Sequence, residues 1–164
     1  MNRRRAQLIE RLESAGRDYV WYLDQLSEAE LHAPPGPDEW TAHQVAAHMR
    51  DTEQQVFLYR VQRLLAEAHP AVESFDQEAW NREHYSPGEP IGKIKSEFRT
   101  ARRKLVRLAR ASSKRDWDNW ATHPEYGKIS LHWLIEHNYS HTLDHLAQIG
   151  RMREAGILKQ LNAQ

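Results

Sequence analysis

The spacing of hydrophobic residues divides the chain into four long segments with helical periodicity. In each segment these residues recur three and four positions apart, which places them on one face of a helix. The predicted helices cover residues 8–26, 42–66, 91–111 and 130–155. Gly and Pro, seven of each, cluster between these segments. Four amphipathic helices predict an all-α fold, a four-helix bundle that forms a single domain over residues 1–164.

Two helix starts can be predicted from capping residues. Thr41 precedes the second predicted helix, and Gln44 three residues later completes a capping box. Ser27 and Glu30 have the same spacing and predict one short helical turn after the first helix.

The connection between the second and third helices, residues 67–90, is long for a link between antiparallel neighbours. It is long enough to cross the bundle, and residues 75–80 within it predict a helical turn. A tryptophan-rich link joins the third and fourth helices. The predicted topology is therefore a four-helix bundle with a long crossover between helices 2 and 3.

The inward face of the fourth predicted helix is unusually polar. Its positions at alternating spacings of three and four are Leu131, Leu134, Asn138, His141, His145, Gln148 and Met152. Four consecutive polar residues on this face give up the stabilisation that buried apolar side chains would provide. Each buried polar group without a hydrogen-bond partner also lowers the stability of the fold by about 1–3 kcal/mol. This pattern indicates a function that compensates for the loss.

The histidine pair within this face has the spacing of metal ligands. His141 and His145 are four residues apart, so their side chains lie about 6 Å apart along one helix face and can reach one ion. His137 extends the row, but positions eight apart are separated by about 12 Å of rise, too far for both outer rings to bind the same ion. A third ligand should therefore come from another helix.

His48 is the leading candidate for that third ligand because it lies on the inward face of the second helix. The alternatives are His43, in the first turn of the same helix, and His137 in place of His145. A reading without metal also stays open, since a histidine pair at this spacing is common on helix surfaces. Candidate groups that would orient the histidines from nearby positions are Asp51, Glu53, Asn138, Asp144 and Gln148.

The composition restricts the chemistry of any such site. The chain has ten His and no Cys, which excludes disulfides, thiolate nucleophiles and cysteine-ligated zinc or iron–sulfur sites. Its 23 Lys and Arg balance 23 Asp and Glu, so no net field attracts nucleic acid or an anionic membrane. No apolar run approaches the roughly 20 residues of a membrane span, and the N-terminal segment does not have the pattern of a secretory signal. We expect a cytoplasmic protein.

Two motifs resemble the DinB/YfiT-like family of metalloenzymes. They are EWTAHQVAAHMRDTE at residues 39–53 and HNYSHTLDHLAQI at residues 137–149. Residues 75–80 and 123–127 also resemble that family, and the similarity extends over residues 8–152. The resemblance implies a four-helix bundle with a crossover after the second helix. It also implies a metal held by one histidine of the second helix and an H-x-x-x-H pair of the last, which correspond to His48, His141 and His145.

The same resemblance implies a function. Members of the family are thiol-dependent transferases and isomerases, in which the metal activates a low-molecular-weight thiol cosubstrate, while others are hydrolases or stress-inducible proteins. We therefore expect a small-molecule substrate and a divalent ion, zinc or nickel, at an open three-histidine site. The alternatives are a hydrolase and a metal-binding protein without turnover. The resemblance and the six Trp also indicate a homodimer.

A second class of function comes from the basic residues of the third helix and the segment after it. These are Lys95, Arg99, Arg102, Arg103, Lys104, Arg107, Arg110, Lys114 and Arg115. Such a stripe can bind nucleic acid phosphates. A solvated helix face is the favoured interpretation, because the overall charge is zero and no nucleic-acid motif is present.

Overall fold

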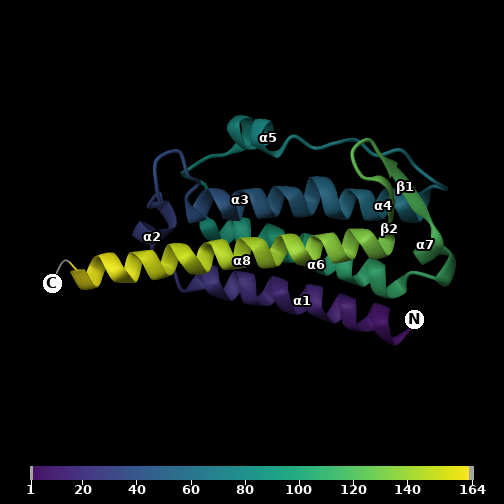
Figure 1. The fold of residues 1–164 in the computed structure, drawn as a ribbon, viewed down its shortest axis with the longest axis horizontal. Coiled ribbons are helices and arrows are strands. Elements are labelled where there is room, and N and C mark those ends of the chain that lie inside the picture. The colour runs from purple at the N-terminus through teal and green to yellow at the C-terminus, as the bar shows by residue number, and fades with distance from the viewer. Residues whose placement is uncertain (1, 163–164) are drawn as a thin grey trace.

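Four long helices form a bundle in the computed structural model, which describes residues 2–162 (Figure 1). They are α1 (Arg3–Asp24), the continuous α3 (Ala42–Thr52), η1 (Glu53–Leu58) and α4 (Tyr59–Ala66), then α6 (Ile91–Ala111) and α8 (Leu131–Asn162). The predicted four-helix bundle is confirmed. No helix in the described part of the chain is both long and apolar enough to cross a membrane.

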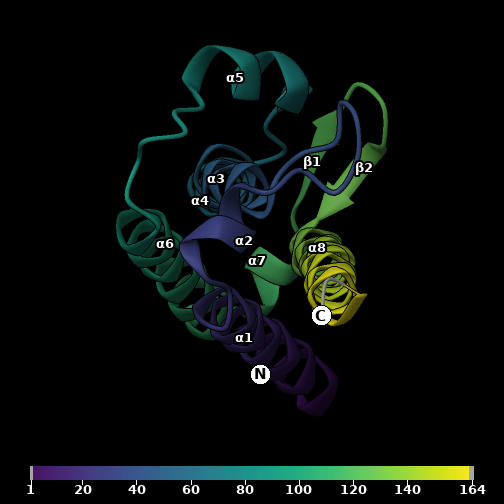
Figure 2. The same cartoon turned by 90° about the vertical axis from the view of Figure 1, so that its left-hand side faces the viewer.

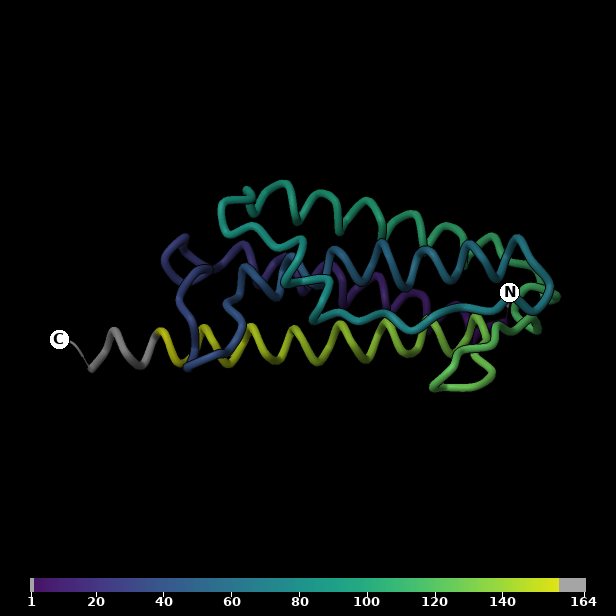
Figure 3. The backbone as a smooth tube through the Cα atoms, turned by 90° about the horizontal axis from the view of Figure 1, so that it is seen from above, coloured from purple at the N-terminus to yellow at the C-terminus, as the bar shows by residue number. Residues whose placement is uncertain are grey.

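The directions in which the four helices run explain the long crossover. Seen end-on, α1 lies between α6 and α8, and α3 lies between the same two helices on the opposite side (Figure 2). The chain runs in one direction along α1 and α8 and in the other along α4 and α6 (Figure 3). Because α4 and α6 are parallel, the chain must return along the bundle between them. The connection that contains α5 (Gln77–His84) makes this return, as predicted.

Both predicted capping boxes are present. Thr41 Oγ1 accepts a hydrogen bond from the Gln44 N–H at 3.2 Å, and Gln44 Oε1 accepts one from the Thr41 N–H at 3.0 Å. Ser27 and Glu30 form the equivalent pair at the start of the short α2 (Glu28–His32). Local sequence therefore determines where these two helices begin.

The link between α6 and α8 contains regular structure that the helical periodicity does not predict. It forms α7 (Lys114–Asp118) and an antiparallel hairpin of β1 (Trp120–His123) and β2 (Gly127–Ser130). An isolated two-stranded hairpin is marginally stable in water. Here Ala121 and Ile129 are fully buried, and Thr122 exchanges backbone hydrogen bonds with the start of the crossover. Tertiary packing thus stabilises the hairpin.

The second long helix also departs from a regular α-helix. Residues Glu53–Leu58 form the π-helical segment η1, directly after Thr52. The Thr52 hydroxyl donates a hydrogen bond to the His48 carbonyl at 2.9 Å. This carbonyl is the one that the Thr52 N–H would bond in an α-helix, so the side chain competes with the backbone where the regular pattern changes.

The hydrophobic core has two parts separated by a polar layer. One part includes Leu12 and Phe57 and lies toward the hairpin, and the other includes Tyr19 and Phe98 and lies toward α2. The polar layer contains Glu53, His48, Arg102, Asn138, His141, Thr142 and His145, together with Gly16. Each of the four bundle helices contributes to this layer, which lies in the middle of the molecule.

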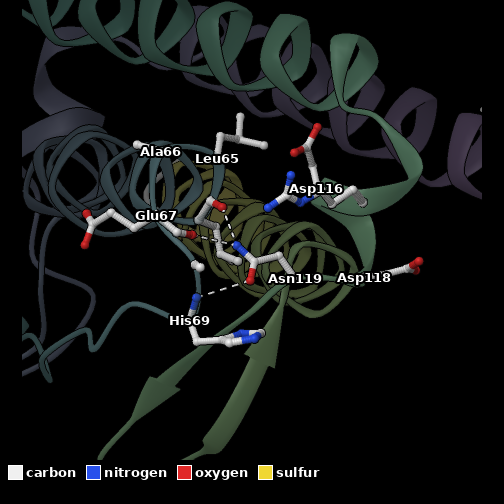
Figure 4. A pocket seen from close by; sticks show the side chains of 10 residues that line it. Leu65, Ala66, Glu67, His69, Asp116, Asp118 and Asn119 are labelled. Atoms are coloured by element: carbon white, nitrogen blue, oxygen red, sulfur yellow. Dashed lines mark hydrogen bonds between the residues drawn. The ribbon is translucent and has the colours of Figure 1, made fainter.

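A cavity of about 520 Å³ lies at the end of α4, beside α7 and β1. Asn119 holds this region together: its amide donates to the carbonyls of Leu64 at 2.7 Å and Glu67 at 2.8 Å, and its oxygen accepts from the His69 N–H at 3.3 Å (Figure 4). These bonds tie together the ends of three elements. Asn119 therefore has a structural role in the wall of this cavity.

Candidate metal centre

Three histidine side chains converge in the polar layer. His48 comes from α3, while His141 and His145 lie one turn apart on α8. The Nε2 atom of His141 is 3.2 Å from Nε2 of His48 and 3.2 Å from Nε2 of His145. Ligand atoms of all three lie within 4.8 Å of one another. The fold thus brings together the three residues that the sequence identifies as the leading ligand set.

Two of the separations between these nitrogens match those of ligands on a single divalent ion. Imidazole ligands about 2.0–2.1 Å from a tetrahedral ion are about 3.3 Å apart, close to the two distances of 3.2 Å. Hydrogen bonding explains the cluster less well, because one proton on His141 Nε2 can serve only one of its two neighbours. An ion accepts lone pairs from all three rings at once.

Burial keeps the three rings in the neutral form that binds metals. It lowers the pKa of His48 to about 3, with a further decrease from the charge that His145 would carry. The pKa of His141 falls to about 2, mainly through burial and then through His145 and His48. Burial also lowers the pKa of His145. At neutral pH the lone pairs are therefore available to an ion.

Contacts around the cluster fix the orientation of the rings. His145 Nδ1 lies 2.8 Å from Gln148 Oε1, so Nδ1 carries the proton and Nε2 directs its lone pair toward the other histidines. Trp40 packs against the His48 ring and Phe57 against the His141 ring, with ring centres 5.2 and 5.6 Å apart. Gln148 is the candidate orienting residue that contacts a histidine of the triad directly.

The other candidate orienting groups either bind arginine side chains or lie at the surface. Asp51 accepts a hydrogen bond from Arg50 at 2.7 Å, and Asp144 is exposed on α8. Glu53 and Asn138 bind Arg102. The buried His141 Nδ1 has no hydrogen-bond partner within the described part of the chain.

Arg102 joins all four helices of the bundle. Its guanidinium donates to both carboxylate oxygens of Glu53 at 2.8 and 2.9 Å, and to the carbonyl of Leu12 at 3.0 Å. On α8 it donates to Asn138 Oδ1 at 2.9 Å and to the Thr142 hydroxyl at 3.0 Å. Asn138 Nδ2 also donates to Glu53 at 3.0 Å. This closed network lies beside the histidines, and we call it the Arg102 network.

The two rival ligands lie outside the cluster. His43 is buried, and its two ring nitrogens lie 3.0 Å from the Tyr85 hydroxyl and 2.8 Å from the Glu89 carbonyl. Its hydrogen-bonding capacity is therefore used elsewhere. His137 stacks on Trp133 with ring centres 4.5 Å apart.

A cleft of about 380 Å³ lies beside the triad, with His141 in its wall. Its apolar wall includes Val56 and Phe57 of η1, and His137 and Tyr126 also line it. Two buried residues in the cleft, Arg60 and His123, were not predicted as site residues. His123 lies in the segment 123–127 that resembles the DinB/YfiT-like family, but no spacing relative to the three histidines identifies either residue as part of the site.

The basic stripe of α6 is partly neutralised. Arg102 is buried, Lys95 and Arg99 pair with Asp24, and Arg110 pairs with Glu13. Several positive charges of the stripe are therefore neutralised by acidic residues of the same protein.

Comparison with known proteins supports the resemblance seen in the motifs. The sequence model of the DinB superfamily matches residues 11–149. The fold is similar to that of YfiT from Bacillus subtilis, described as a probable metal-dependent hydrolase with an unusual four-helix bundle topology. The TM-score is 0.84 at 20% sequence identity, over 95% of this chain and 90% of YfiT. The chain has no significant match among curated proteins.

Proposed function

The chain belongs to the DinB superfamily, and we propose that it is a metal-dependent enzyme in which His48, His141 and His145 hold a divalent ion. The convergence of three neutral Nε2 atoms carries this proposal. Three protein ligands leave a coordination position for water or substrate, as in catalytic rather than structural sites. When bound, the ion would lower the pKa of a coordinated water or thiol and polarise a carbonyl oxygen.

The residues of the chain have separate roles in this proposal. Gln148 holds the His145 ring in the tautomer that directs Nε2 toward the ion. Phe57 and Val56 cover one wall of the cleft and limit access of bulk water. His137 lines the same cleft one turn before His141 and would be the candidate general base for the nucleophile.

Water is the nucleophile in the first form of the proposal. The similar fold of YfiT, a protein described as a probable metal-dependent hydrolase, supports hydrolysis of an ester or amide. This activity needs no cosubstrate beyond water, and the cleft of about 380 Å³ is in the size range of small-molecule sites.

A thiol is the nucleophile in the second form. The motifs at residues 39–53 and 137–149 resemble those of thiol-dependent transferases and isomerases. Because the chain has no Cys, the sulfur would come from a low-molecular-weight cosubstrate. An ion held by the three histidines would lower the pKa of that thiol and favour its thiolate form, with the proton passing to solvent or to a base in the cleft.

Metal analysis tests the proposal first. Purified protein should contain about one equivalent of a divalent ion, which we expect to be zinc or nickel because imidazole ligands suit both. The loaded protein is then assayed with aryl esters and anilides, and with an electrophile plus a panel of low-molecular-weight thiols. Metal-dependent turnover in one panel identifies the nucleophile. A fully loaded protein inactive in both panels would instead indicate metal binding without catalysis.

A further inference from the structure

Three arginine side chains are buried in the described part of the chain: Arg50, Arg60 and Arg102. Two of them are neutralised by carboxylates. Arg102 binds Glu53 through both carboxylate oxygens. The carboxylates bonded to Arg50 are Asp51 at 2.7 Å, Glu89 at 2.9 Å and Glu97 at 3.1 Å. Within residues 2–156, no carboxylate lies within 4.0 Å of the Arg60 guanidinium, so its charge has no ion-pair partner.

The protein contacts of Arg60 do not replace a carboxylate. Its Nη2 donates to the Glu73 carbonyl at 2.6 Å, a neutral acceptor in the crossover. The same Nη2 lies 3.1 Å from His123 Nε2 at the end of β1. No side chain or carbonyl in the described structure accepts a hydrogen bond from Nε or Nη1. Burial lowers the pKa of Arg60, and the charges of Tyr126 and Glu125 oppose this shift without cancelling it.

The contact between Arg60 and His123 brings two donors together. His123 Nδ1 accepts hydrogen bonds from the backbone N–H groups of Glu125 at 3.1 Å and Tyr126 at 3.4 Å. Burial and the charge of Arg60 lower the pKa of His123, so its ring is neutral at pH 7. A neutral ring that accepts at Nδ1 carries its proton on Nε2. The Nε2–H therefore faces a guanidinium N–H, and the acceptor that both donors need is absent from the protein.

These two donors line the same cleft as His141. They come from segments far apart in the sequence, α4 and β1, which the bundle brings together beside the triad. A buried cation without a counter-charge is costly, and an arginine fork matches the two oxygens of a carboxylate. The position thus combines a positive charge that has no ion-pair partner within residues 2–156 with a place in the cleft that His141 also lines.

We propose that Arg60 and His123 bind a carboxylate group of the substrate, in the cleft that they share with His141. The proposal rests on the proposed function and specifies its substrate class, a small molecule with a carboxylate. The exposed rim of the cleft carries Asp76, Glu78 and Glu125, which would repel a polyanion. One compact anionic group at the buried end of the cleft fits this charge distribution.

Matched hydroxamic acids test the proposal on the metal-loaded protein. One member of each pair carries a terminal carboxylate and the other a neutral amide, on succinyl, glutaryl and adipyl chains. The hydroxamate binds the ion in both, so the ratio of their dissociation constants isolates the contribution of the carboxylate. We expect the carboxylate to bind at least tenfold more tightly at one chain length or more, as measured by calorimetry.

Two variants assign this preference to Arg60. Arg60→Gln should weaken binding of the carboxylate compound to the level of the amide, with the amide affinity and the metal content unchanged. Arg63→Gln is the matched control, because Arg63 is a more exposed residue of the same helix and pairs with Glu67. It should retain the full preference. Equal affinities in the wild type at every chain length, or a preference that survives in Arg60→Gln, would overturn the proposal.

A conservative variant covers the case in which Arg60→Gln fails to fold. Arg60→Lys keeps the charge and loses the fork, so the carboxylate preference should fall at least threefold. An unchanged preference in this variant would contradict a role for the guanidinium.

A metal-free measurement separates this inference from the proposed function. If the protein binds no metal, the proposed function fails and the hydroxamates give no information. The decision then rests on fluorine NMR of the metal-free protein with 4,4,4-trifluorobutyrate and its amide. Saturable binding of the carboxylate alone, lost in Arg60→Gln and kept in Arg63→Gln, supports the anion site. Equal signals from both compounds, or none, reject it.

Discussion

Two polar clusters share the middle layer of the bundle, and they differ in how their hydrogen bonds are completed. Both draw on the same stretch of α8, which contributes Asn138 and Thr142 to the Arg102 network and His141 and His145 to the triad. In the network, donors face acceptors at 2.8–3.0 Å. In the triad, three nitrogens of the same kind face one another.

This difference separates a structural cluster from a functional one. Buried polar groups that satisfy one another add specificity to a core, and removing one member leaves its partner unpaired. Groups that converge without complementary partners lose stability unless a ligand completes them. The network therefore explains how the four helices are held in register, and the triad and the Arg60 site are the places where we propose that a ligand binds.

The largest expected effect is on the triad. His141→Ala removes the nitrogen that lies between the other two, so we expect metal binding to be lost while the helical bundle remains folded. Elemental analysis and circular dichroism measure the two results. Unfolding of this variant would mean that the ion is structural. His132→Ala, an exposed position on the same helix, is the control and should keep its metal.

The next largest effect is on the Arg102 network. Arg102→Met leaves the Glu53 carboxylate buried without its partner, which should lower the free energy of unfolding by about 3–5 kcal/mol. Urea denaturation of the metal-free protein measures this change without a contribution from the ion. Arg103→Met changes an exposed neighbour and should have little effect. If the two variants were equally stable, the result would contradict a structural role for the Arg102 network.

Acid should destabilise the metal-free protein through the triad. The pKa values of His48, His141 and His145 lie below the ordinary value of 6.5, so the unfolded chain binds more protons than the folded one below that pH. The stabilisation is complete above pH 6.5 and decreases as the pH falls toward the folded pKa values, by at most about 1.4 kcal/mol per pH unit for each ring. Urea denaturation from pH 7 to pH 5 should show this slope, and His141→Ala should reduce it. Equal slopes in the two proteins would contradict the assignment.

A smaller effect is expected at the residue that orients the triad. Gln148→Ala removes the acceptor of His145 Nδ1–H, and we expect metal affinity to fall about tenfold with little change in stability. Competition with a chromophoric chelator measures the affinity. Gln148→Glu keeps an acceptor and should retain most of it. A Gln148→Ala protein with unchanged affinity would show that packing alone orients the ring.

The smallest expected effect on stability is at Gly16 of α1, which leaves space for the Arg102 side chain. A Cβ atom on Gly16 would lie 2.9 Å from Arg102 Nη1, so Gly16→Ala must displace the guanidinium. Overpacking costs about 1–3 kcal/mol, and the better helix propensity of Ala offsets about 1 kcal/mol of this. We expect a net loss of about 1 kcal/mol in thermal or urea denaturation. A more stable variant would show that Arg102 has room to move.

The sequence by itself determined the four helices and the three converging histidines. Periodicity of hydrophobic residues reports which helix face is buried, and a spacing of four on one helix fixes the distance between His141 and His145. Because His48 lies on the inward face of the second predicted helix, it was the leading candidate for the third ligand. Capping boxes at Ser27 and Thr41 fixed two helix starts because they depend only on local hydrogen bonds.

The tertiary structure decided which polar residues face one another. Arg102 belongs by sequence to a basic stripe on a solvated helix face, but in the fold it is buried and binds Glu53 and Asn138, two residues expected near the histidines. Arg60 and His123 meet only because the hairpin packs beside α4. Such contacts join residues between 36 and 63 positions apart, and local periodicity carries no information about them. The structure therefore distinguished the closed Arg102 network from the three converging histidines and from Arg60, which has no ion-pair partner within residues 2–156.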